Sequence, residues 1–113
     1  MNIAFIGCGF VADFYMATIL NYNNLNLVKV YDRDKKRLKK FIQFYNLKQA
    51  RSFDEIIQDE NIEMIINLTN PREHFKIIKK CLLNNKHVYT EKPLSMNFKD
   101  AYFLYKLANK KKL

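Results

Sequence analysis

Short, mainly apolar runs alternate along this chain with longer segments in which apolar residues recur every three or four positions. The runs are residues 2–6, 27–31, 64–68 and 87–90, and each is followed by a glycine or by polar residues. Runs of this length are typical of strands that are buried on both faces of a parallel sheet. Residues 48–50 are at best one further short strand.

The intervening segments predict helices. One covers Phe10 to about Leu20, and a second covers 35–45 with Leu38, Phe41, Ile42 and Tyr45 on its inner side. The others start at helix signals: Ser52 with Glu55 three residues on, Pro71 in a first turn, and Asn97 with Asp100. Strands that alternate with helices predict an α/β fold, a doubly wound parallel sheet with right-handed crossovers, formed by a single domain over residues 1–113.

Composition restricts the setting of this domain. Apolar residues make up 49% of 113 residues, which is enough for a buried core. No run reaches the roughly 18 to 20 apolar residues of a membrane span, and the first residues lack the features of a secretory signal. Cys8 and Cys81 are far apart and match no metal or disulfide spacing. We therefore expect a cytoplasmic protein with no bound metal and no membrane partner.

The formal net charge of +9 raises the question of nucleic-acid binding. The basic residues gather in 34–40, in 76–80 and in 110–112. In the expected topology the first two groups lie on helices that cover opposite faces of the sheet, whereas a protein that follows phosphates concentrates its charge on one face. Solvated helix surfaces are therefore the favoured interpretation, ahead of a nucleic-acid surface.

The two glycines of the chain form one motif, the G-x-G-x-x-A of Gly7-Cys8-Gly9-Phe10-Val11-Ala12. It lies between the first strand and the first helix. In such a loop the first glycine permits a tight turn, and the second lets the backbone approach a pyrophosphate. The small Ala12 allows close packing of helix on strand, and the helix N-terminus offers free N–H groups to phosphates. Cys8 is interpreted as a spacer, since no partner base for a nucleophile is evident.

An acid follows the second strand. Asp32 lies twenty residues beyond Ala12, where a carboxylate can accept hydrogen bonds from a ribose diol. A carboxylate there repels a 2′-phosphate and favours NAD over NADP, while Arg33 beside it can stack on adenine or attract that phosphate. Methyltransferases share part of this pattern but usually carry a third glycine, and nothing later in the chain supports them.

Two later segments complete the pattern, Asn67-Leu68-Thr69-Asn70-Pro71-Arg72-Glu73-His74 and Thr90-Glu91-Lys92-Pro93-Leu94-Ser95. Both follow strands, so both are expected beside the glycine loop. With Val30-Tyr31-Asp32-Arg33, they make the whole chain resemble the glucose–fructose oxidoreductase and inositol 2-dehydrogenase family (Gfo/Idh/MocA). The E-K-P segment is the most specific element of this resemblance.

The resemblance implies a role for each segment. It makes Lys92 the catalytic residue, which orients substrate and stabilises charge at the reacting oxygen, with Glu91 contacting the cofactor or holding Lys92. It implies that 69–74, including His74, line the nicotinamide ribose, although Asn70 and Pro71 are exchanged relative to the common T-P-N form. The full set of expected cofactor contacts is Gly7, Gly9, Phe10, Val11, Ala12, Asp32, Arg33, Leu68, Thr69, Asn70, Pro71, His74, Glu91, Lys92 and Pro93.

The resemblance also implies a second, C-terminal α/β domain that carries most of the substrate pocket. We therefore expect a truncated enzyme: a cofactor domain of an NAD- or NADP-dependent oxidoreductase for a sugar, cyclitol or related alcohol, which binds dinucleotide weakly or not at all and is inactive alone. A homo-oligomer is expected for the full enzyme. The last helix carries apolar residues on more than one face, which suits a further partner surface. The alternative hypothesis is a stand-alone nucleotide-binding or sensor module.

Overall fold

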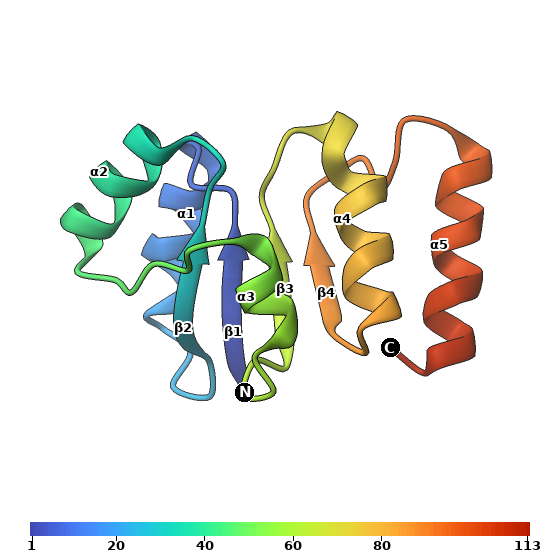
Figure 1. The fold of residues 1–113 in the computed structure, drawn as a ribbon, viewed down its shortest axis with the longest axis horizontal. Coiled ribbons are helices and arrows are strands. Elements are labelled where there is room, and N and C mark those ends of the chain that lie inside the picture. Colours follow the sequence, from blue (N-terminus) through green and yellow to red (C-terminus); the bar gives the residue numbers. More distant parts are fainter.

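Four parallel strands form the centre of the computed structural model, which describes all residues from 1 to 113 (Figure 1). They are β1 (Asn2–Ile6), β2 (Asn26–Tyr31), β3 (Met64–Asn67) and β4 (His87–Thr90). Their order in the sheet is β2-β1-β3-β4, and every neighbouring pair is parallel. The chain therefore moves outward from β1 to β2 and then crosses to the other side of β1. This confirms the predicted doubly wound sheet and places its switch point between β1 and β3, where such sheets bind ligands.

The possible strand at 48–50 is reduced to one isolated bridge, Val30 to Gln49. Two backbone hydrogen bonds hold it, from Val30 N to the Lys48 carbonyl at 3.0 Å and from Ala50 N to the Val30 carbonyl at 2.9 Å. The next helix begins at Phe53, so only a few residues are available to extend along β2.

Five helices begin within a residue or two of the predicted positions. They are α1 (Phe10–Ile19), α2 (Lys35–Tyr45), α3 (Phe53–Gln58), α4 (Pro71–Leu83) and α5 (Phe98–Lys111). The Ser52 hydroxyl accepts from Glu55 N, as the capping box predicts. The return bond differs, because the Glu55 carboxylate accepts from Arg51 N rather than from Ser52 N.

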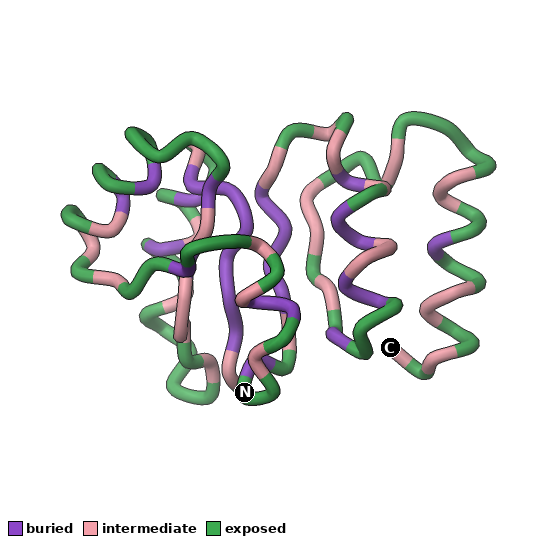
Figure 2. Tube along the Cα trace, in the orientation of Figure 1, coloured by how far each residue is buried: buried purple, intermediate pink, exposed green.

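The helices cover the two faces of the sheet, and β1 is buried on both (Figure 2). On one face α1 and α2 enclose a core of Ile3, Phe5, Ala12, Met16, Val30, Leu38 and Phe41, with Cys8, Ile66 and Leu68. On the other face α3 and α4 enclose Ala4, Ile6, Ala50, Ile56, Ile57, Ile62, Ile65, Ile77 and Cys81. The basic groups of α2 and α4 therefore belong to helices on opposite faces, as predicted.

The last helix, α5, lies against α4 rather than on the sheet (Figure 1). Leu104 is 1% exposed and packs with Ile78 and Leu82. The outer side of α5 carries aromatic rings, and Phe98 stacks on Tyr102, which stacks on Tyr105. This confirms the apolar surface expected on more than one face of the helix. None of the helices has the length and apolar character that crossing a bilayer requires.

Candidate functional site

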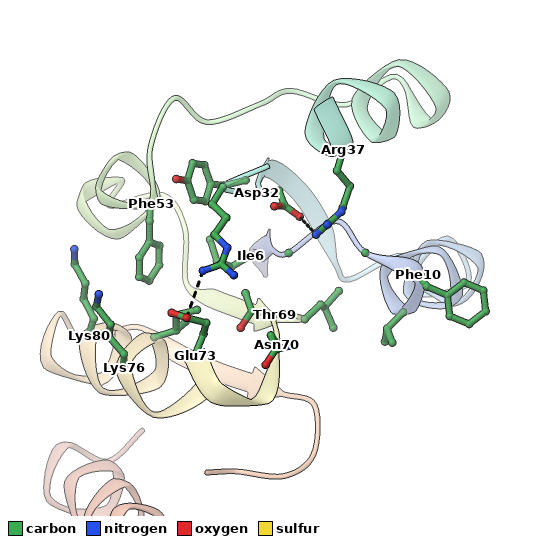
Figure 3. A pocket seen from close by; sticks show the side chains of 17 residues that line it. Ile6, Phe10, Asp32, Arg37, Phe53, Thr69, Asn70, Glu73, Lys76 and Lys80 are labelled. Carbon is green, nitrogen blue, oxygen red and sulfur yellow. Dashed lines mark hydrogen bonds and ion pairs between the residues drawn. The ribbon is translucent and has the colours of Figure 1, made fainter. Parts of the chain in front are cut away.

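A cavity of about 520 Å³ opens at the carboxyl ends of β1, β2 and β3 (Figure 3). Its volume lies within the range of roughly 300 to 1,000 Å³ that small-molecule sites occupy. Nine of the residues expected to contact a cofactor line it, namely Gly7, Gly9, Phe10, Val11, Asp32, Arg33, Leu68, Thr69 and Asn70. Residues as far apart in the sequence as Gly7 and Asn70 therefore meet at one site.

The two glycines of the loop have different structural requirements. Gly7 has φ +98°, and a Cβ there would lie 2.7 Å from the carbonyl carbon and oxygen of Leu68. Gly7 N donates to the Tyr31 carbonyl at 2.8 Å, which ties the turn to β2. Gly9 has an ordinary extended backbone, and a Cβ there would meet nothing within 4 Å. Protein packing therefore explains Gly7, whereas the space beside Gly9 is open towards the cavity.

The N-terminus of α1 is the only helix start without a side-chain cap. The other four helices are capped by Asp34, Ser52, Asn70 and Asn97. Four N–H groups at a helix start lack partners within the helix, and they carry partial positive charge. At α1, Gly9, Phe10 and Val11 line the cavity, while Ala12 is fully buried and its N–H donates to the Gly9 carbonyl at 2.9 Å. Backbone N–H groups in this arrangement fit a phosphate, so this end of the cavity fits the pyrophosphate of a dinucleotide.

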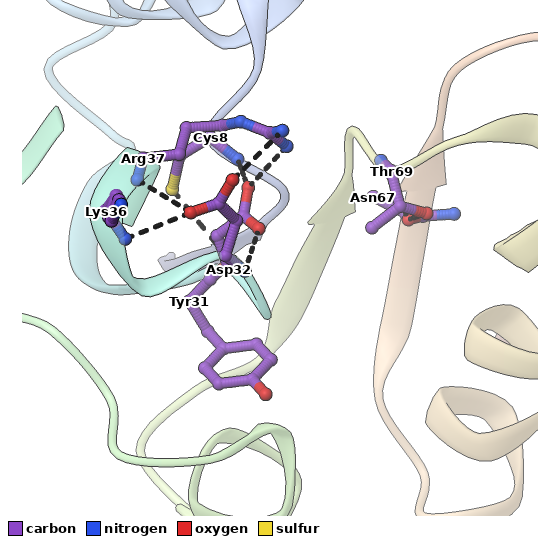
Figure 4. Close-up of polar contacts among 8 residues, drawn as sticks. Cys8, Tyr31, Asp32, Lys36, Arg37, Asn67 and Thr69 are labelled. Carbon is purple, nitrogen blue, oxygen red and sulfur yellow. Dashed lines mark hydrogen bonds and ion pairs between the residues drawn. The ribbon is translucent and has the colours of Figure 1, made fainter. Parts of the chain in front are cut away.

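Asp32 lies at the floor of the cavity, 4% exposed, with its carboxylate turned to the glycine loop (Figure 4). One oxygen accepts from Cys8 N at 2.9 Å and faces the Arg37 guanidinium at 3.3 Å. The other accepts from Asp34 N at 2.8 Å. Asp32 therefore holds the loop as well as facing the ligand space, and only part of its acceptor capacity is left for a ribose diol.

Charged residues that the sequence analysis did not single out complete the cavity wall. Arg37, Lys76 and Lys80 join Arg33, so four cationic side chains face two carboxylates, Asp32 and Glu73. Arg33 pairs with Glu73 at 3.4 Å, and Lys80 pairs with Asp54. The surplus of positive charge suits an anionic ligand. Lys76 and Lys80 lie at the opposite end of the cavity from Phe10 (Figure 3).

His74 and Pro71 do not line the cavity. Pro71 forms the first turn of α4, and the His74 ring is fully buried. His74 Nδ1 lies 2.7 Å from the Pro93 carbonyl oxygen, and Nε2 lies 3.0 Å from that of Thr69. The structure thus gives His74 a holding role between α4 and the E-K-P segment. Direct contact with a nicotinamide ribose stays a prediction.

A buried asparagine joins the same strand ends. Asn67 is fully buried and accepts from the Thr69 hydroxyl at 2.7 Å (Figure 4). Its Nδ2 donates to the Thr90 hydroxyl at 3.0 Å. It was not among the predicted site residues. A polar residue that ends an apolar strand was the signal that could have identified it.

The E-K-P segment borders the site without lining the cavity. The Tyr15 hydroxyl donates to the Glu91 carboxylate at 2.6 Å. Lys92 is exposed, and its ammonium has no hydrogen bond or ion pair. The Lys92 ammonium, the predicted catalytic cation, is therefore free, whereas hydrogen bonds from Tyr15 and His74 hold Glu91 and Pro93 on either side of it.

Neither cysteine has the character of a nucleophile. Burial, with the nearby Asp32 carboxylate, raises the pKa of the Cys8 thiol to about 12. Burial likewise raises the pKa of Cys81 to about 12. Both stay protonated at neutral pH, in agreement with the interpretation of Cys8 as a spacer.

The family described as "Oxidoreductase family, NAD-binding Rossmann fold" (GFO_IDH_MocA) matches residues 1–113. Myo-inositol 2-dehydrogenase of Thermotoga maritima is 26% identical over 89% of this chain and 30% of its own length. Trans-1,2-dihydrobenzene-1,2-diol dehydrogenase of Xenopus laevis is 37% identical over 63% of this chain and 22% of its own length.

Solved structures share the fold. Biliverdin reductase from Synechocystis, determined with biliverdin and NADP+, superposes with a TM-score of 0.91 at 22% identity, covering 98% of this chain and 35% of that one. The chain thus spans about a third or less of the length of these proteins.

Proposed function

Because the chain belongs to the Gfo/Idh/MocA oxidoreductase family, we propose that it holds the nicotinamide cofactor of a dehydrogenase or reductase that acts on a small secondary alcohol. The observation that carries the proposal is the uncapped start of α1, which borders a cavity beside the open face of Gly9. A pyrophosphate is the group that such a backbone cradle recognises.

The adenosine half of the cofactor would lie along the end of β2. Asp32 would accept from the ribose hydroxyls, and Arg33 would stack on the adenine. The Asp32 carboxylate disfavours a 2′-phosphate, which supports NAD as the cofactor. Arg33 and Arg37 offset that repulsion in part, so NADP is the second cofactor to test.

The nicotinamide half would extend past Phe10 and Val11 towards the E-K-P segment. When bound, the nicotinamide supplies the hydride acceptor or donor of the reaction. Lys92 would donate a hydrogen bond to the substrate oxygen as charge develops there. The free ammonium of Lys92 is suited to this because no carboxylate neutralises it.

The names of two relatives support a substrate class for this proposal. Myo-inositol 2-dehydrogenase and the dihydrobenzenediol dehydrogenase both have names that describe oxidation of a ring carrying neighbouring hydroxyl groups. We propose a sugar, cyclitol or related polyol for the full-length enzyme. A homo-oligomer and a cytoplasmic location remain predictions from the sequence.

Titration of the ¹⁵N-labelled chain with NAD+, NADP+ and a short DNA duplex tests the cofactor assignment. We expect NAD+ to shift the amide resonances of Gly9, Phe10 and Val11, and Asp32→Ala to weaken binding at least about tenfold, which is 1.4 kcal/mol. Asp100→Ala removes the same charge far from the cavity and is expected to leave binding unchanged. Duplex binding without dinucleotide binding would refute the proposal.

A further inference from the structure

Two tyrosines of this chain donate to carboxylates, and one of these bonds reaches the E-K-P segment. The Tyr15 hydroxyl, on α1, donates to Glu91 Oε1 at 2.6 Å and so joins residues 76 positions apart. We propose that Tyr15 is a positioning residue, which fixes Glu91 and thereby sets the place of Lys92 beside the nicotinamide. The inference rests on the proposed function.

The packing around Tyr15 fixes the direction of its hydroxyl. Its ring meets Phe5 edge-on at 6.2 Å, and Phe5 is fully buried in the sheet. The ring of Tyr89, on β4, also lies edge-on to it, with the ring centroids 6.2 Å apart. Burial and the adjacent Glu91 carboxylate raise the pKa of Tyr15, so its hydroxyl stays a donor at neutral pH. The bond therefore connects Glu91 to a rigid part of the molecule.

The other side of Lys92 is fixed by α4. His74 reaches the Pro93 carbonyl at 2.7 Å from a fully buried position. Glu91 N donates to the Asn67 carbonyl at 3.2 Å, which aligns the segment with the end of β3. Lys92 thus lies between two anchored neighbours, one tied to α1 and one to α4.

The backbone on both sides of Lys92 is held in place, whereas the Lys92 side chain is free to rotate. The exposed Lys92 ammonium can move only through its own torsions, since the backbone on both sides is held. A catalytic group must keep its reacting atom within about 0.5 Å of the productive place. Without the Tyr15 bond, Glu91 keeps only its backbone bond to the Asn67 carbonyl, so the Glu91 side chain and the backbone of Lys92 gain motion.

NMR relaxation of the 113-residue chain without ligand tests the anchor directly. We expect the backbone order parameter of Lys92 to be near 0.85 in the parent chain and to fall towards about 0.6 in Tyr15→Phe, whereas Thr90, which is paired in β4, stays rigid. Tyr45→Phe is the matched control, because it removes a tyrosine–carboxylate bond of 2.8 Å, to Asp13, elsewhere on α1. It should leave Lys92 rigid.

A double-mutant cycle separates positioning from a general loss of packing. Glu91→Ala should reduce the order of Lys92 as Tyr15→Phe does, and the double variant should add nothing further. Additive effects, or unchanged order in Tyr15→Phe, would overturn the proposal. If Tyr15→Phe does not fold, Glu91→Ala alone must still show the loss of order.

The functional consequence is read at Lys92 with two ligands. NAD+ should shift the Lys92 ¹³Cε resonance, whereas adenosine diphosphate ribose, which lacks nicotinamide, should not. In Tyr15→Phe that difference should disappear while the Gly9 amide still responds to both ligands. Persistence of the difference would overturn the inference. If Gly9 responds to neither ligand in the parent chain, the proposed function fails, and the relaxation data still decide the anchor.

Discussion

Alanine at Gly9 should separate binding from stability. Gly9 has φ −79° and ψ −174°, a conformation open to alanine, and the added Cβ meets no protein atom within 4 Å. Alanine reduces unfolded-state entropy, which stabilises by about 0.4–1 kcal/mol, but it is a poorer N-cap than glycine by a similar amount. The two effects offset each other, so the net change in the free energy of unfolding should stay within about 1 kcal/mol.

The same methyl group should strongly reduce dinucleotide binding. It would occupy the space through which a phosphate approaches the first N–H groups of α1, and we expect at least about tenfold weaker binding of NAD+, or 1.4 kcal/mol. Gly7→Ala provides the contrast. Its φ of +98° and the 2.7 Å contacts with backbone atoms of Leu68 should cost about 2–5 kcal/mol of stability, the sum of conformational strain and overpacking.

Urea unfolding followed by circular dichroism measures the stability of both variants, and NMR titration with NAD+ measures binding. If Gly9→Ala binds NAD+ like the parent chain, no phosphate lies beside Gly9. If Gly9→Ala loses as much stability as Gly7→Ala, the space beside Gly9 is not open.

Three further outcomes are expected. Cys8 and Cys81 should react slowly with a thiol reagent in the native chain and rapidly in urea, since a pKa of about 12 leaves roughly one thiol in ten thousand ionised at pH 8; fast native labelling would contradict the burial of both. A hydrogen bond from Lys29 lowers the pKa of Asp59, and hydrogen bonds from Arg51 N and, to a smaller extent, Lys29 lower the pKa of Glu55. Both carboxylates therefore stabilise the fold above their unfolded pKa values of 3.8 and 4.5, and this stabilisation is lost as the pH falls through the lowered folded values. In Lys29→Met, the urea concentration at the midpoint of unfolding should fall less steeply as the pH is lowered. An unchanged slope would exclude the contacts of Lys29 with Glu55 and Asp59 as its source. Leu104→Ala should cost about 2–5 kcal/mol and raise amide exchange in α5 more than in the sheet; uniform exchange would show that α5 does not open separately.

The positions of the helices and strands along the chain could be predicted from the sequence. Strand runs, helix starts at Ser52, Pro71 and Asn97, and the Gly7-x-Gly9 turn all depend on neighbours within a few positions, where periodicity and backbone preference act. The cavity at the ends of the strands also followed, because the topology of a doubly wound sheet brings those ends together. The limit appeared at 48–50, where a single bridge replaced a strand because hydrogen-bond partners, rather than composition, decide whether three residues pair.

Side-chain partners across the fold became visible only in three dimensions. Nothing in the sequence indicates that the Asp32 carboxylate accepts from Cys8 N, 24 positions away, nor that His74 is buried against Pro93. Lys76 and Lys80 read as a solvated helix face, yet they border the cavity. The Tyr15–Glu91 bond joins elements that meet only after β3 and β4 have assembled beside β1. Such contacts depend on the direction of each side chain across packed elements, which no local pattern encodes.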